Sequence, residues 1–217
     1  DNALQESSDT RVRQAYGLAV HLLHAEIPLK WLINPDKASR TQTDFSASAR
    51  RVYTTTSCFA PRNFRSGPIA IVPGFEAQAQ MVINSYGNGI RVYELQTATS
   101  VNVATNITHK PKVLVESQNS DIHTDILSDA GLISGTHYQV GTITNFDEAS
   151  CFTVLTVPHN DGISTATVNG ARIFLQNGGN LLAQCAGLRG FQGLQIASTR
   201  LFNSAGFQDN PGLSTLQ

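Results

Sequence analysis

The sequence predicts an α/β fold built from two halves, and three observations support this class. The 217 residues are enough for one large domain or two small ones with a real hydrophobic core. Apolar residues recur either with helical spacing or in short β-branched runs bounded by Gly and Pro. The two kinds of segment alternate along the chain, which is the pattern of α/β proteins.

The first half, residues 1–100, alternates between helix and strand. Its first helix places apolar residues, among them Tyr16, on one face and is stopped by Pro28. Trp31 lies in an apolar run and is expected in the core, whereas the polar stretch 34–50 shows no strong period. The elements expected here are helices over 11–25 and 75–87, and strands over 28–33, 66–73 and 90–96.

The second half, residues 111–217, is joined to the first by an Asn- and Thr-rich segment, 101–110, which we interpret as a linker. Its order of strands and helices is that of a doubly wound parallel sheet. The expected strands are 112–117, 137–143, 152–158 and 180–185, with helices over 123–132 and from about Thr165 to Gly178. Ile173 is expected to face inward on the second helix, and the N-terminal half is expected to pack against this sheet.

Composition disfavours several classes of function. The 15 Lys and Arg face 16 Asp and Glu with no basic run, which argues against nucleic-acid binding by phosphate neutralisation. No apolar stretch approaches the roughly 18 residues of a membrane span. The low charged fraction, 14%, and the many Asn, Gln, Ser and Thr residues are typical of secreted proteins and of self-associating subunits. We therefore expect self-association or a protein partner and an extracellular or cell-surface location, with the cytoplasm as the alternative; the polar start at Asp1 favours a processed form.

The cysteines and histidines predict no metal or cofactor. The three cysteines are far apart and form no CxxC pair, although a Cys58–Cys151 bridge is possible in an oxidising compartment. The histidines form no HxH or HExxH pattern. A flavin or nucleotide site is disfavoured because neither GxGxxG nor GxxxxGK[ST] is present.

The segment GGNLLAQCAG, residues 178–187, carries the sharpest chemical signal. A glycine pair ends a helix, a short strand follows, and Cys185 lies where the chain turns between small residues. Such a turn is typical of a nucleophile elbow, in which small neighbours let the nucleophile adopt a strained backbone. Backbone N–H groups after the turn then face the sulfur.

This segment, preceded by TVPH, resembles the core of class I glutamine amidotransferase-like domains over roughly residues 110–195. The resemblance implies a flavodoxin-like fold with Cys185 as nucleophile. Amidotransferase members complete the site with a downstream His and Glu, but residues 186–217 contain neither. In the glyoxalase and chaperone branch a glutamate at the end of the first strand bonds the cysteine, and Glu116 has a similar place. That branch's downstream histidine is also missing, and His159 is the residue that can approach the same sheet edge.

Two functions follow from these observations. The first is a non-catalytic binding or self-assembly module on a degenerate amidotransferase-like scaffold. The alternative is a cysteine-dependent hydrolase or glyoxalase-like enzyme that uses Cys185, Glu116 and His159. Each residue also has a structural interpretation: Cys185 as a buried small side chain, Glu116 as a turn or capping carboxylate, and His159 as a solvent-facing loop residue. An imidazole within bonding reach of the sulfur would favour the enzyme.

Overall fold

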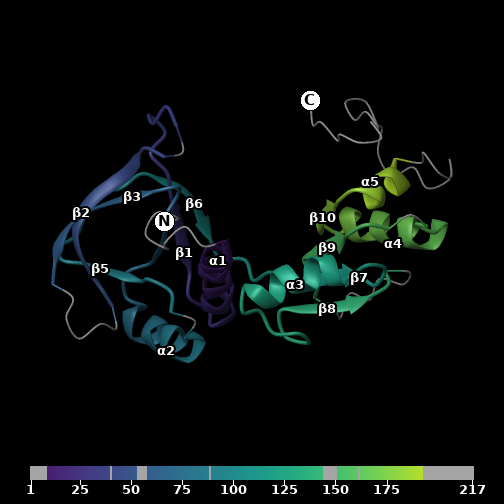
Figure 1. Cartoon of the computed structure of the whole chain (residues 1–217), viewed down its shortest axis with the longest axis horizontal. Helices are drawn as coiled ribbons and strands as arrows, with labels where there is room; N and C mark the ends of the chain where they lie inside the picture. Colours follow the sequence, from purple (N-terminus) through teal and green to yellow (C-terminus); the bar gives the residue numbers. More distant parts are fainter. Residues whose placement is uncertain are drawn as a thin grey trace. The chain divides into compact units, whose positions relative to one another are not determined.

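The structure, a computed structural model, describes residues 9–39, 41–52, 58–87, 89–143, 151–160 and 162–192. The chain divides into two compact units. The first unit comprises Asp1–Lys110 with Asp129–Leu132, and the second comprises Pro111–Ser128 with Ile133–Gln217. Figure 1 shows the helices and strands of both. Across the described residues, no helix combines the length and apolar character needed to cross a membrane.

The first unit is built from antiparallel strands and two helices. One sheet has the order β4-β1-β6 and the other the order β3-β2-β5. The elements are α1 (Asp9–His24), β1 (Leu29–Leu32), β2 (Thr43–Arg51), β3 (Ala60–Arg65), β4 (Ile69–Ile71), α2 (Glu76–Tyr86), β5 (Tyr93–Leu95) and β6 (Val103–Ile107). Buried residues from α1, α2 and β1 form its core, among them Leu22, Leu29 and Ala79.

Four expectations for this unit differ from the structure. The linker prediction is wrong over Val103–Ile107, because these residues form β6, paired with β1. The 34–50 stretch contains all of β2 except Arg51, and it shows no strong period because the buried residues of β2 are only Asp44 and Ala49. Tyr16 is 51% exposed, and Trp31 is 40% exposed with its indole N–H donated to Gly67 O at 3.0 Å. The indole N–H needs a hydrogen-bond partner, and Trp31 finds one in Gly67 O at this exposed position.

The second unit contains a four-stranded parallel sheet with the order β10-β9-β7-β8. Its elements are β7 (Val113–Glu116), α3 (Asp121–Asp129), β8 (Tyr138–Gly141), β9 (Val154–Val157), α4 (Thr165–Gln176), β10 (Asn180–Ala183) and α5 (Ala186–Phe191). The predicted α/β class and the parallel sheet are confirmed. The apolar run that predicts a central strand is β9, which has β10 on one side and β7 on the other.

The core of this unit lies between the sheet and α4. Leu114, Leu155 and Val157 from the strands pack with Val168, Ala171 and Phe174 from the helix. Gly170 permits this close approach, since a Cβ there would lie 1.8 Å from the carbonyl oxygen of Ile143. Ile173 does not face inward as predicted but is 49% exposed, because the helix turns Ala171 and Phe174 toward the sheet instead.

Candidate functional site

Three predicted site residues follow three strands of the parallel sheet. Glu116 ends β7, His159 lies two residues after β9, and Cys185 lies two residues after β10. Parallel strands present their carboxyl ends at one edge, which is where α/β sheets bind ligands. The topology therefore gathers these residues at a single edge of the sheet, formed by the carboxyl ends of β7, β9 and β10.

The backbone at Cys185 forms a strained turn between β10 and α5. Cys185 has φ 50° and ψ −129°, a conformation that non-glycine residues rarely adopt. The small residues that follow are needed for packing: a Cβ on Gly187 would lie 2.4 Å from Pro158 O, and one on Gly190 2.6 Å from Ile163 Cδ1. The start of α5 is thus pressed against the end of β9, as the elbow pattern in the sequence requires.

The structure brings His159 to the sulfur of Cys185. The distance between His159 Nδ1 and Cys185 Sγ is 3.0 Å, which is hydrogen-bond distance. Cys185 is exposed rather than buried, so the interpretation as a buried small side chain is wrong. Asn119 Nδ2 donates to His159 O at 2.5 Å and ties the loop after β7 to the loop after β9. His159 is therefore held beside the thiol by its own backbone.

Glu116 is buried at the same edge and only partly satisfied. It is 3% exposed. Ser117 Oγ donates to Oε1 at 3.3 Å and lies 3.0 Å from Thr142 Oγ1, whereas Oε2 has no hydrogen-bond partner within the described part of the chain. Buried polar atoms without a partner are uncommon and often mark a functional role.

Sequence reasoning missed a contact one residue before Cys185. His123 on α3 is 4% exposed, and its Nε2 lies 2.7 Å from Gln184 Oε1. The sequence carries little signal for this pair, because a lone histidine on a short helix has no distinctive spacing. The sequence predicts that Asn119 lies in a loop, but it does not predict the hydrogen bond from Asn119 to His159.

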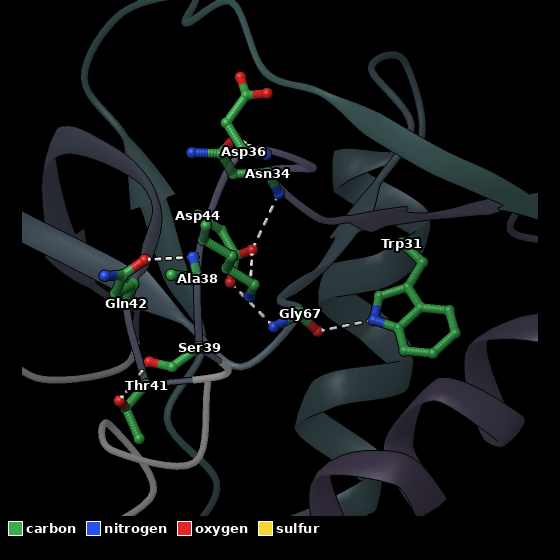
Figure 2. A network of polar contacts seen from close by, with 10 residues as sticks. Trp31, Asn34, Asp36, Ala38, Ser39, Thr41, Gln42, Asp44 and Gly67 are labelled. Carbon is green, nitrogen blue, oxygen red and sulfur yellow. Dashed lines mark hydrogen bonds and ion pairs between the residues drawn. The ribbon is translucent and has the colours of Figure 1, made fainter.

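A second buried polar cluster lies in the first unit around Asp44 (Figure 2). Asp44 Oδ1 accepts from Asn34 N at 3.0 Å and from Lys37 Nζ at 2.5 Å, and Oδ2 accepts from Gly67 N at 2.9 Å. Burial raises the pKa of Asp44, but the hydrogen bonds from Lys37, Gly67 and Asn34 outweigh it and hold that pKa below its ordinary value. Both oxygens are used, so this cluster is a structural clamp between loops.

The candidate site of the second unit therefore consists of the Cys185 thiol and the His159 imidazole. Cys58, Cys151 and Cys185 are in no disulfide, so the possible Cys58–Cys151 bridge is not formed in this structure. No group of three or more His, Cys, Asp or Glu side chains within the described ranges is arranged to hold a metal ion. Comparison of the chain with protein-family models, with curated proteins and with solved structures found no match.

Proposed function

We propose that the second unit is a cysteine-dependent enzyme of the acyl-transfer or hydrolase type, with Cys185 as nucleophile and His159 as general base. The observation that carries this proposal is the 3.0 Å distance between His159 Nδ1 and Cys185 Sγ at an exposed, strained turn. A nucleophile with a base in hydrogen-bond reach is the recurring signature of covalent catalysis. It favours the enzyme over the binding module.

The fold supports the same proposal. Numbered by their order in the chain, the four parallel strands lie in the order 2-1-3-4, which is how the flavodoxin-like order begins. We therefore propose a flavodoxin-like unit related to the class I amidotransferase-like proteins, in which His159 replaces the downstream histidine that this chain lacks. Self-association and a secreted or cell-surface location stay predictions.

The proposed reaction has two half-reactions. His159 takes the thiol proton while the sulfur attacks an acyl carbonyl carbon, and the resulting imidazolium protonates the departing amine or alcohol. A thioester on Cys185 remains. Water, deprotonated by His159, then attacks that thioester, and the sulfur leaves as the thiol with the proton returned from His159. In the nucleophile elbow that the sequence resembles, the N–H of the residue after the nucleophile, here Ala186, would donate to the carbonyl oxygen as it becomes negative.

The test uses p-nitrophenyl acetate, a minimal activated ester. We expect rapid release of p-nitrophenolate and an acetyl adduct on Cys185, seen by mass spectrometry of the peptide. Cys185→Ser and His159→Ala should each lower the acylation rate by at least about 100-fold, the usual contribution of a general base.

Cys151 provides the matched control. It is also exposed and also has a positive φ, 52°, so it matches Cys185 in exposure and in φ. Cys151→Ser should leave acylation unchanged. Equal modification of Cys151 and Cys185 in the unaltered protein would overturn the proposal, because the histidine would then confer no advantage.

A further inference from the structure

His123 is a buried histidine that the proposed reaction does not use. It is 4% exposed, lies near the start of α3, and contacts Gln184, the residue directly before the nucleophile. Its Nε2 lies 2.7 Å from Gln184 Oε1. Because an amide oxygen can only accept, Nε2 is the protonated nitrogen and donates this bond.

The other nitrogen of the ring has no hydrogen-bond partner among the described residues. His123 Nδ1 is buried without a hydrogen bond. In the neutral imidazole Nδ1 is an acceptor, and leaving a buried acceptor unpaired costs about 1 to 3 kcal/mol. Only one nitrogen of the buried His123 ring is therefore hydrogen-bonded. The bond from that nitrogen to Gln184 is the interaction that this histidine provides.

Gln184 fixes the upstream side of the elbow. Its backbone N donates to Val157 O at 3.0 Å, which extends the pairing of β10 with β9, and its carbonyl accepts from Gly187 N at 2.9 Å. The side-chain bond from His123 is a third restraint, and it comes from a different element. A strained residue keeps its conformation only when its surroundings over-determine it, and the next residue is Cys185.

We propose that His123 is a positioning residue, which holds Gln184 so that the Cys185 sulfur stays within reach of His159. The inference rests on the proposed function and deepens it. In this proposal His123 acts through the backbone around Cys185 and not by contact with substrate. Small displacements of a reacting group matter here, because an error of about 1 Å can lower a rate by roughly 100-fold.

The experiment measures the second-order rate constant for alkylation of Cys185 by iodoacetamide in the full chain, alongside acylation by p-nitrophenyl acetate. His123→Ala should lower both rates by about 10-fold or more. His123→Gln keeps an N–H near the position of Nε2 and should restore them to within about threefold of the unaltered protein. Combining His123→Ala with Gln184→Ala should lower the rates no further than either change alone, since both remove the same bond.

His137 is the control for loss of a buried imidazole in the same unit. It is 3% exposed and accepts from Ile133 N at 2.9 Å through Nδ1. His137→Gln should leave the reactivity of Cys185 unchanged, and circular dichroism should show each variant folded. An unchanged rate in His123→Ala, or an equal loss in His137→Gln, would overturn the positioning role while leaving the Cys185–His159 proposal intact. If Cys185 of the unaltered protein reacts no faster than Cys151, the proposed function fails and the positioning role fails with it.

Discussion

The two units each bury a carboxylate, and the two are satisfied very differently. Asp44 in the first unit receives three donors and uses both oxygens. Glu116 in the second unit accepts one long bond from Ser117, and its Oε2 has no hydrogen-bond partner in the residues that the structure describes. A fully bonded carboxylate stabilises the loops around it, whereas a partly bonded one retains capacity for another group. The comparison separates a side chain kept for stability from one that can serve chemistry.

Removing Asp44 should give the largest effect on stability. Asp44→Ala leaves Lys37 and two backbone N–H groups without their acceptor, and breaking a buried ion pair costs about 3 to 5 kcal/mol. Denaturant unfolding followed by the fluorescence of Trp31, the single tryptophan, measures this in the first unit. The control is Asp36→Ala, because Asp36 is exposed and its carboxylate points away from the cluster in Figure 2. An equal loss in both variants would contradict the clamp.

Gly67→Ala should give the next largest effect. Gly67 has φ 67°, and a Cβ there would lie 2.4 Å from the indole nitrogen of Trp31. We expect a loss of about 2 to 3 kcal/mol, because backbone strain and displacement of the indole add together. Gly74→Ala is the matched control: its φ is 96° but no atom lies within 4 Å of the new Cβ, so it should lose only about 1 kcal/mol. Equal losses would show that the indole yields without cost.

Acid should remove the contribution of Asp44. A carboxyl group whose pKa is lowered by folding stabilises the fold above its unfolded pKa, and this contribution is lost as pH falls through the folded pKa. At pH 7 the unaltered protein should be more stable than Asp44→Asn by about 1 to 3 kcal/mol, the range for bonds to a charged group. The difference should shrink as the pH is lowered from about 5 toward 2. A difference independent of pH would mean that the charge of Asp44 contributes nothing.

Glu116→Gln should have the smallest effect on stability. Its long bond to Ser117 contributes little, so we expect the second unit to change by less than about 1 kcal/mol. Hydrogen exchange at the β7 amides, read by mass spectrometry, reports this locally. A loss as large as that of Asp44→Asn at pH 7 would contradict the comparison and make Glu116 a structural residue.

The sequence predicted the second unit better than the first, for a physical reason. Buried parallel strands are apolar on both faces, so β7 and β9 are visible as continuous runs. The antiparallel β6 has no buried residue, and β2 buries only Asp44 and Ala49, so neither strand shows the alternation of apolar and polar residues that predicts a strand. Exposed side chains of β2 instead form hydrogen bonds with the neighbouring strand, such as that from Ser46 Oγ to Asn63 Oδ1 at 2.7 Å. The spacing of residues in the sequence does not predict such bonds.

The candidate site was predictable as far as strand ends define it. The turn at Cys185 follows from small residues around a cysteine, and the carboxyl edge of a parallel sheet brings the ends of β7, β9 and β10 together. The sequence could not predict how close His159 lies to the sulfur, because this distance depends on the path of the loop that Asn119 holds by a hydrogen bond. The Gln184–His123 pair was invisible, since it joins residues 61 positions apart.

The positive φ of Cys185 has a consequence for the whole unit. Glycine adopts such a backbone readily, whereas a cysteine there costs about 1 to 3 kcal/mol. Glycine would therefore be the more stable residue at this turn, but the chain has cysteine there. At position 185 the protein therefore gives up some folding stability and gains a thiol at this turn.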